Sequence, residues 1–370
     1  MRGLLQLRPP AAVRGRDPVT TIASTGLVCP TPMTSSARIQ LGHGSGGKLS
    51  AALVRDHFLP HFGNEVLAQL GDAATLELPH GRIAVSTDTF VVSPLEFPGG
   101  NIGTLAVHGT VNDLAMMGAE PRYLTAGFVL EEGLPFDVLD RIIATMAQAA
   151  RDANVLLVTG DTKVVERGRA DGIYVNTTGI GMLDEVVRPG PHRARPGDAV
   201  LVSGQLGRHG MAVMAFREGL AFESAITSDT AALVPLVRLL KEVAGAELRV
   251  LRDPTRGGAA SALNEIAQAS KVGITLDERC LPVPTDVAAA CEMLGLDPLY
   301  VANEGVLVAF MPAPLADRAL AALHAHPLGA HAAKIGEVVE RHPGMVVLRT
   351  GIGGTRVVDM LPGDQLPRIC

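Results

Sequence analysis

Hydrophobic positions divide the chain into short alternating runs and longer runs with helical spacing. In the first half, alternation of apolar and polar residues, many of them β-branched, predicts strands over 83–92, 123–130, 155–158 and 173–182. Apolar residues three or four positions apart predict a helix over 101–117 that ends at Gly118, and another that Pro135 opens. Strands and helices therefore alternate, as in an α/β layer.

The second half repeats this mixture. Strands are predicted at 199–202, 273–277, 305–310, 335–339, 345–349 and 355–359, and helices near 207–218, 229–244, 258–270, 286–294 and 314–325. Between the halves, turn-forming residues fill 188–197. We therefore expect two α/β domains, 38–190 and 191–350, followed by a strand and a mobile tail over 351–370.

Residues 1–37 contain several prolines and no sustained periodicity. We expect a disordered extension, with a targeting peptide and a start at Met33 as the open alternatives. A secretory signal is a poor fit because Leu4 and Leu5 do not extend into an apolar core. The chain has no run of about 18 apolar residues, so no membrane span is expected.

The composition of the chain argues against several classes of function. Apolar residues make up 47% of the chain, which provides for a large core. The net charge of −6, with 3% aromatic residues and no Trp, argues against a nucleic-acid surface. The cysteines are Cys29, Cys280, Cys291 and Cys370, without a CxxC pair, so neither a thiolate zinc site nor a disulfide scaffold is expected. Reduced thiols suit the cytoplasm.

The last residue of the chain is a cysteine, Cys370. Chain ends are usually the least ordered part of a domain, so this thiol is expected on a mobile tether. A tethered thiolate can act as a nucleophile that collects a chemical group at one site and delivers it to another. From position alone, an inert terminal cysteine is the simpler interpretation.

Carboxylates lie at predicted strand ends and turns of the first half, downstream of a glycine loop. The loop is 43–48 and contains Gly44, Gly46, Gly47 and Lys48; the carboxylates are Asp72, Asp88, Asp113 and Asp161. Magnesium prefers such hard oxygen ligands together with phosphates, and glycine N–H groups can approach phosphate closely. The loop does not have the P-loop spacing. The pattern favours a magnesium–nucleotide site, with helix caps and turns as the alternative.

A second glycine turn precedes a predicted helix. Asp253, Arg256, Gly257 and Gly258 combine a carboxylate, a cation and two flexible residues just before the helix starts. This arrangement is typical of a phosphate-facing helix N-terminus. An ordinary capped helix start is the alternative.

Together these motifs resemble the HypE family of hydrogenase maturation factors. The resemblance runs from about residue 38 to the end and rests on 43–48, 71–74, 86–101, 107–117, 158–165, 253–258, 302–305 and the terminal Pro-Arg-Ile-Cys. It implies the aminoimidazole ribonucleotide synthetase-like fold. In that fold, a mixed N-terminal sheet forms a barrel across a homodimer, and an α/β domain covers an ATP site near the interface.

The resemblance also implies an activity. A HypF-like carbamoyltransferase would load a carbamoyl group onto Cys370, and ATP with Mg²⁺ would serve to dehydrate it to a thiocyanate. A HypC–HypD-like complex would receive the cyano group as a ligand for the iron of [NiFe]-hydrogenase. Glu304 matches the family's base, and Lys163 would orient the amide or stabilise phosphate charge. A turn carboxylate and a solvated lysine are the structural alternatives for these two residues.

Three other functions are weighed against this interpretation. Selenophosphate synthetase carries a reactive Cys or selenocysteine in its glycine loop, and loop 43–48 has none. Aminoimidazole ribonucleotide synthetase needs no terminal cysteine. A non-catalytic metallochaperone would use Cys370 to bind iron or nickel, but a single thiol is a weak metal site.

Overall fold

The computed structural model describes residues 37–45, 48–69, 74, 76, 78, 81–183, 185–220, 226–360, 366 and 368–370. The expected extension over 1–37 lies outside these ranges except for Ala37. Gly46, Gly47 and Asp72 also lie outside them, as does the side chain of Lys48.

The N-terminal half combines one sheet with helices. Its elements are α1 (Lys48–Leu53), α2 (Leu59–Phe62), β1 (Ile83–Phe90), β2 (Glu96–Phe97), β3 (Gly100–Asn101), α3 (Ile102–Met116), β4 (Ala119–Glu131), α4 (Phe136–Asp152), β5 (Leu156–Val165) and β6 (Ile173–Leu183). Asn101 caps α3 by accepting hydrogen bonds from the Gly103 and Thr104 amides, which explains why the helix begins there. The predicted strands and helices of this half are all present, while α1 and α2 were not predicted.

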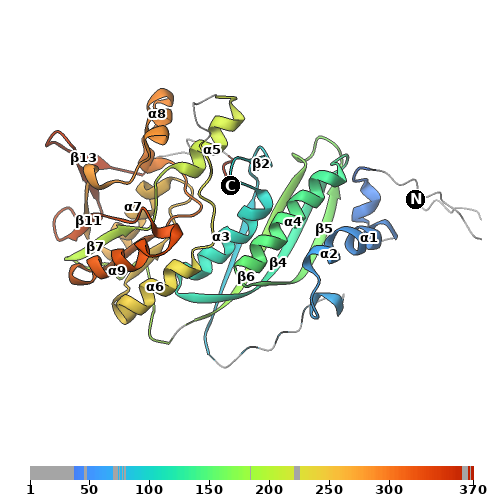
Figure 1. The fold of residues 1–370 in the computed structure, drawn as a ribbon, viewed down its shortest axis with the longest axis horizontal. Coiled ribbons are helices and arrows are strands. Elements are labelled where there is room, and N and C mark those ends of the chain that lie inside the picture. Colours follow the sequence, from blue (N-terminus) through green and yellow to red (C-terminus); the bar gives the residue numbers. More distant parts are fainter. Residues whose placement is uncertain are drawn as a thin grey trace, which may run out of the picture. The chain divides into compact units, whose positions relative to one another are not determined.

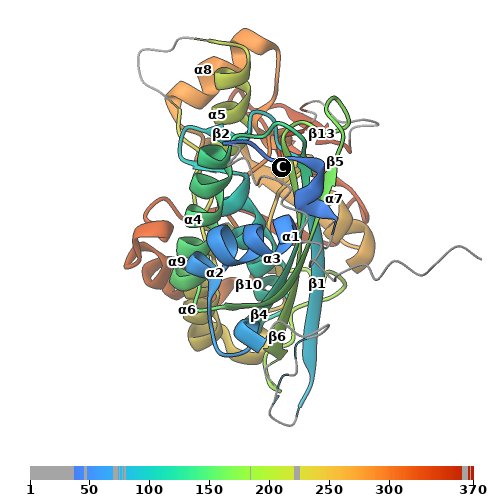
Figure 2. The same cartoon turned by 90° about the vertical axis from the view of Figure 1, so that its right-hand side faces the viewer.

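The sheet of this half has the strand order β1-β6-β4-β5. Strands β4 and β5 are parallel, and the other pairs are antiparallel. Helices α3 and α4 lie along one face (Figures 1 and 2). Because side chains alternate between faces, β4 buries Leu124, Ala126 and Phe128 beneath these helices and leaves the intervening residues partly exposed. Among the described residues, no helix covers the opposite face of the sheet.

The C-terminal half is built around a larger sheet. Its elements are β7 (Asp198–Val202), α5 (Arg208–Arg217), α6 (Val234–Ala244), β8 (Val250–Arg252), α7 (Gly258–Ser270), β9 (Gly273–Asp277), α8 (Thr285–Leu294), β10 (Val308–Pro312), α9 (Ala316–His324), β11 (Ala333–Val339), β12 (Val346–Arg349) and β13 (Thr355–Val358). The strand order is β13-β12-β9-β11-β7-β10-β8, antiparallel except for β9 beside β12.

Both faces of this sheet are buried at its centre. Ala199 and Leu201 of β7 belong to the same apolar cluster as α6 and α9, whereas Val200 and Val202 pack with α7. Two predicted starts in this half differ from the structure by three residues or more. Helix α6 starts at Val234 rather than 229, because Pro235 suits only the first turn. Strand β10 starts at Val308 rather than 305, which leaves Gly305 in a loop.

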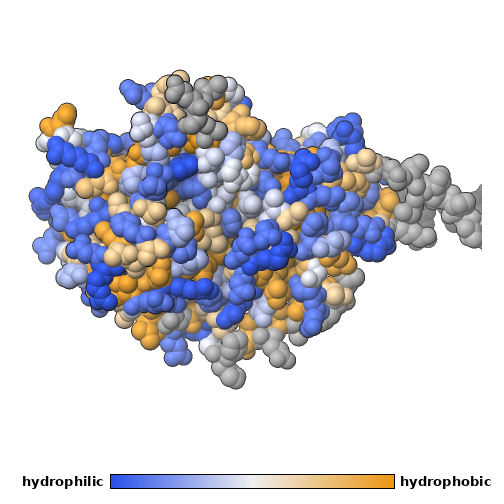
Figure 3. All heavy atoms as spheres, in the orientation of Figure 1, coloured by the Kyte–Doolittle hydropathy of each residue, from blue (hydrophilic) through white to orange (hydrophobic). Residues whose placement is uncertain are grey.

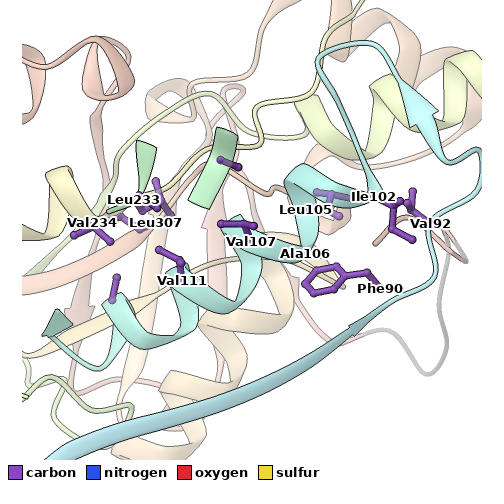
Figure 4. Close-up of a cluster of buried hydrophobic side chains, with 14 of the residues drawn as sticks. Phe90, Val92, Ile102, Leu105, Ala106, Val107, Val111, Leu233, Val234 and Leu307 are labelled. Atoms are coloured by element: carbon purple, nitrogen blue, oxygen red, sulfur yellow. The ribbon is translucent and has the colours of Figure 1, made fainter. Parts of the chain in front are cut away.

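Helix α3 connects the two halves. Twelve of its fifteen residues are buried, as expected of a helix that is covered on all sides. Figure 4 shows Val107 and Val111 of α3 in one cluster with Phe90 of the N-terminal half and Leu233 of the C-terminal half. Asn112 fixes this contact, because its amide donates to the Ala231 carbonyl at 2.9 Å and accepts from the Leu233 N–H at 2.8 Å.

On the face of Figure 3, hydrophilic residues predominate and apolar residues are interspersed among them. Among the described residues, no helix is long and apolar enough to cross a membrane.

Candidate active site

Four predicted carboxylates lie around α3. Asp113 is on the helix itself, and the Ser86 hydroxyl donates to it at 2.6 Å. Asp88 of β1 faces the helix: a Cβ added to Gly109 would lie 3.5 Å from Oδ2 of Asp88. Asp253 follows β8, and Glu304 lies in the loop before β10. The structure therefore brings together Asp88, Asp113, Asp253 and Glu304 from four separate segments.

Burial dominates the electrostatics of this cluster. It raises the pKa values of Asp88 and Asp113, although hydrogen bonds from Thr89 and Ser86, respectively, oppose the rise. Burial and the charge of Asp113 raise the pKa of Asp253 to about 7. Burial raises the pKa of Glu304 well above its usual range, and the neighbouring carboxylates add to this effect. The cluster is thus short of positive charge.

The backbone of Glu304 is fixed by another carboxylate, that of the half-buried Asp229. The N–H groups of Glu304 and Gly305 donate to its two oxygens at 3.3 and 3.2 Å. Asn112 donates to the Glu304 carbonyl at 3.4 Å. By contrast, Oε1 of Glu304 is buried and has no hydrogen-bond partner among the described groups. Its backbone is held while a carboxylate oxygen remains available for a ligand.

Sequence reasoning missed Asp229, because the helix was predicted to start at that residue. Pro235 at the second position of α6 was the available indication that the helix begins later and that Asp229 lies in a loop. Burial raises the pKa of Asp229 to about 6.

Asp161 and Lys163 form a separate group on β5. The Lys163 ammonium contacts both Asp161 oxygens, at 2.8 and 2.6 Å, and this hydrogen bond lowers the pKa of Asp161. Both residues line a cavity of about 310 Å³ together with His43, Gly44 and apolar residues such as Phe58. Gly44 packs directly on the strand, because a Cβ there would lie 2.5 Å from the Val164 amide nitrogen.

The strand register separates the two groups. Asp88, Thr177, Ala126 and Gly160 form one row across the sheet. Three strand spacings make this row roughly 14 Å long. Asp161 follows Gly160 and therefore points to the opposite, helix-free face. The structure does not bring Asp161 or Lys163 to the carboxylates around α3 within one chain.

The second glycine turn forms the start of α7. Gly257 and Gly258 both have left-handed φ angles, +75° and +61°. A Cβ on Gly258 would lie 2.7 Å from the Val301 carbonyl oxygen, so only glycine fits here. Arg256 is exposed, and its charge lowers the pKa of Asp88, against the larger effect of burial. The predicted helix N-terminus is present, beside the carboxylate cluster.

The chain end is docked in this structure, and its expected mobility stays a prediction. The Val91 amide donates to the main-chain oxygen of Cys370 at 3.1 Å, and the Ser93 amide donates to the main-chain carbonyl of Arg368 at 3.2 Å. Leu366 and Ile369 are buried. Burial of these apolar side chains, which flank Arg368, stabilises the docked tail. Cys370 therefore lies beside Val91, three residues along the chain from Asp88.

The residues present can be tested against a magnesium ion. Among the described residues, no three His, Cys, Asp or Glu side chains are placed to hold a metal. Asp88 does raise the pKa of Asp113 through its charge, so two carboxylates lie close together. Magnesium usually binds one or two carboxylates together with phosphates and water. The pair fits an ion that arrives with a nucleotide.

Known proteins match both halves of this geometry. Residues 70–183 match the family described as AIR synthase related protein, N-terminal domain, and residues 195–348 match the corresponding C-terminal domain. The carbamoyl dehydratase HypE of Rhizobium leguminosarum bv. viciae is 54% identical over 336 residues, which cover 91% of this chain and 96% of the relative. The chain belongs to the HypE family.

Solved HypE structures agree with this assignment. A crystal structure of the hydrogenase maturation protein HypE in complex with ATP has a TM-score of 0.85 at 51% identity, and covers 89% of this chain and 99% of that one. A HypE–HypF complex has a TM-score of 0.74 at 47% identity, covering 84% and 100%. The resemblance to the HypE family and the two-domain α/β fold are both confirmed.

Proposed function

We propose that the chain is an ATP-dependent carbamoyl dehydratase that serves hydrogenase maturation. The names of its HypE relatives support this activity, and the ATP complex of one relative supports the nucleotide. One observation on this chain carries the proposal: the terminal Cys370 is docked beside Val91, next to the strand that bears Asp88. A thiol that carries a substrate group is thereby held near a cluster of buried and half-buried carboxylates.

The reaction converts an S-carbamoyl group, S–C(=O)–NH₂, into S–C≡N. The amide oxygen attacks the terminal phosphorus of ATP, and ADP leaves. Phosphate becomes the leaving group, so the oxygen atom of the amide departs on phosphorus. The nitrogen loses two protons, one when the O-phosphoryl intermediate forms and one when phosphate leaves. The net change is loss of one water, coupled to hydrolysis of ATP to ADP and phosphate.

Glu304 is the proposed base for these protons. Its unpartnered Oε1 is available to accept an N–H proton from the substrate group. Burial, which raises the pKa of Glu304, also strengthens its ionised form as a base. Asp229 and Asn112 act by holding the loop, so that the carboxylate keeps its direction.

The nucleotide site is assigned to the remaining predicted residues. Asp88 and Asp113, together with Asp72, would hold Mg²⁺, which neutralises phosphate charge when bound. Asp253, Arg256, Gly257 and Gly258 would face phosphate at the start of α7. The loop with Gly44, Gly46, Gly47 and Lys48 would cover the phosphates, and the cavity beside Asp161 and Lys163 would take the base.

We further infer that a homodimer completes the active site. The helix-free face of the first sheet carries the exposed apolar side chains Ile83 and Val85, which a second copy would cover, in line with a barrel across two subunits. Asp161 and Lys163 also lie on this face, away from the carboxylates of their own chain. We infer that Lys163 of one copy acts beside Glu304 of the other, where the edges of the two sheets meet.

Two partners follow from the chemistry. A carbamoyl donor must reach Cys370, and the HypE–HypF complex of a relative supports a HypF-like carbamoyltransferase. An acceptor must take the cyano group, and a HypC–HypD-like iron scaffold is the proposed recipient.

Mass spectrometry of the C-terminal peptide tests the activity. After incubation with the carbamoyltransferase, carbamoyl phosphate and ATP, Cys370 should gain a carbamoyl group and then lose one water. Omission of ATP from the second step should stop the reaction at the carbamoyl adduct. Cys370→Ala should abolish the adduct, while the exposed Cys280 stays unmodified in both proteins. An adduct on another cysteine would overturn the assignment of Cys370.

A mixing experiment tests the shared site. Lys163→Met and Glu304→Gln should each be inactive as homodimers. After random exchange of subunits, half of the dimers are mixed and each has one intact site, so about a quarter of the wild-type dehydration rate should return. No recovery after verified exchange would place Lys163 and Glu304 in the same chain's site.

A further inference from the structure

Helix α5 provides side chains that hold the docked tail by its backbone. His209 Nε2 lies 2.9 Å from the Ile369 carbonyl oxygen, and Arg217 Nη2 donates to the Arg368 carbonyl at 2.7 Å. Arg217 Nε also donates to the Ser93 carbonyl at 2.7 Å, so one guanidinium links the tail to the segment on which it docks. His209 and Arg217 therefore bind main-chain carbonyls of the tail and not its side chains.

The hydrogen-bond pattern defines the state of His209. A carbonyl can only accept, so Nε2 carries the proton, and Nδ1 accepts from the Ser228 hydroxyl at 2.8 Å. The imidazole is fully buried, and burial lowers its pKa to about 4. His209 is therefore a neutral donor with a fixed direction.

Other features work against docking. Arg368 has a left-handed φ of +58°, which is strained for a residue with a side chain. The guanidinium groups of Arg217 and Arg368 repel each other, which adds to burial in lowering the pKa of Arg217. Arg368 Nη2 is buried without an acceptor among the described groups, while Nη1 pairs with the exposed Asp171 at 2.6 Å. Strain and repulsion thus oppose the apolar anchors Leu366 and Ile369.

We propose that α5 is a latch for the C-terminal tail, in which His209 and Arg217 are positioning residues that set how much of the time Cys370 is docked. The proposal rests on the carrier role of Cys370. Because docking is a balance of opposing contributions, loss of one latch contact shifts the population toward the released tail. A released thiol is more accessible to a carbamoyl donor and is held less at the carboxylate cluster.

Thiol alkylation tests the latch on the full chain, without ATP or a partner. The chain would be treated with N-ethylmaleimide, and the alkylation rates of individual cysteines measured by peptide mass spectrometry. The exposed Cys280 is an internal rate reference, and the buried Cys291 reports whether each variant is folded. Arg217→Met removes the donors and keeps the apolar stem. Arg318→Met, at an exposed position of α9, is the matched control.

Arg217→Met should raise the rate at Cys370 relative to Cys280 about tenfold, since a charge-assisted hydrogen bond is lost. Arg217→Lys should give a smaller increase because it keeps one cationic donor, and Arg318→Met should give none. His209→Phe, which keeps a ring but removes the donor, should also raise the alkylation rate of Cys370 relative to Cys280. An unchanged Cys370 rate in Arg217→Met and His209→Phe, with Cys291 still protected, would overturn the latch.

The two proposals can fail separately. A rise in alkylation without any carbamoyl adduct on Cys370 would retain the latch and remove the carrier role. If both hold, Arg217→Met should load carbamoyl at least as fast as wild type and dehydrate it more slowly. Slower loading together with slower dehydration would contradict the latch.

Discussion

Replacement of Asp229 by Asn tests the role of a half-buried carboxylate that holds the catalytic loop in place. Asn keeps the volume and one acceptor oxygen, but its amide nitrogen faces one of the two N–H groups of Glu304 and Gly305. A buried N–H left without an acceptor costs about 1–3 kcal/mol in the free energy of unfolding. The loop should loosen, and we expect kcat to fall at least tenfold with the KM for ATP nearly unchanged.

The hydrogen bonds that Asp229 accepts stabilise the folded chain, whereas ionisation of its carboxyl group lowers the free energy of unfolding. Burial raises the pKa of Asp229 from 3.8 to about 6. Between these values the folded chain retains a proton that the unfolded chain has released, so wild-type stability falls as pH rises and levels off above the folded pKa. A shift of about two units corresponds to about 3 kcal/mol when complete. About 1.6 kcal/mol of this is already lost by pH 5, which leaves about 1.4 kcal/mol to be lost between pH 5 and pH 8.

Urea denaturation of the two proteins at pH 5, 6, 7 and 8 measures this difference, at one fixed protein concentration. The Asn variant lacks the titration, so wild type should lose about 1.4 kcal/mol relative to it over this range. Asp317→Asn, at an exposed position of α9, serves as the control. A stability difference that stays constant from pH 5 to pH 8 would refute the reasoning about Asp229.

Two further variants separate the steps of the site. Glu304→Gln keeps the shape of the base and should bind ATP and accept the carbamoyl group but accumulate the carbamoyl adduct; dehydration at the wild-type rate would make Lys163 the next candidate base. Asp88→Ala should weaken Mg²⁺–ATP binding by about tenfold or more in calorimetry, because a hard oxygen ligand is lost; unchanged affinity would remove it from the metal site. Gly258→Ala should lower the free energy of unfolding by at least about 2 kcal/mol, because φ is +61° and the Cβ meets the Val301 carbonyl; a variant as stable as wild type would contradict this fit.

Local patterns were sufficient to predict most elements of the fold. Strand β9 (Gly273–Asp277) was predicted to the residue, and α7 begins at the second glycine of its turn. Short elements were missed, because β8 has three residues and too few positions to show alternation. The start of α6 was misjudged because apolar spacing outweighed the indication from Pro235.

The site depends on contacts that no local pattern contains. Motifs and the family resemblance pointed to Asp88 and Glu304. They did not show that the strand register places Asp161 on the other face of the sheet, because strand order is a tertiary property. Docking of the tail was not foreseen either. The bond from the Arg368 Nε to the Val91 carbonyl spans 277 positions, and His209 and Arg217 fall on a helix whose pattern shows only that it is helical.

The burial of α3 on all sides has a consequence for how such proteins diverge. Asn112 contacts the C-terminal half, and the adjacent Asp113 belongs to the carboxylate cluster, so one helical turn serves both the junction and the chemistry. An exchange between relatives made at the linker near residue 190 would pair α3 from one parent with its covering residues from the other. Chimeras should fold only when α3 and the C-terminal half come from the same parent. This helix and the residues that cover it should therefore be exchanged together.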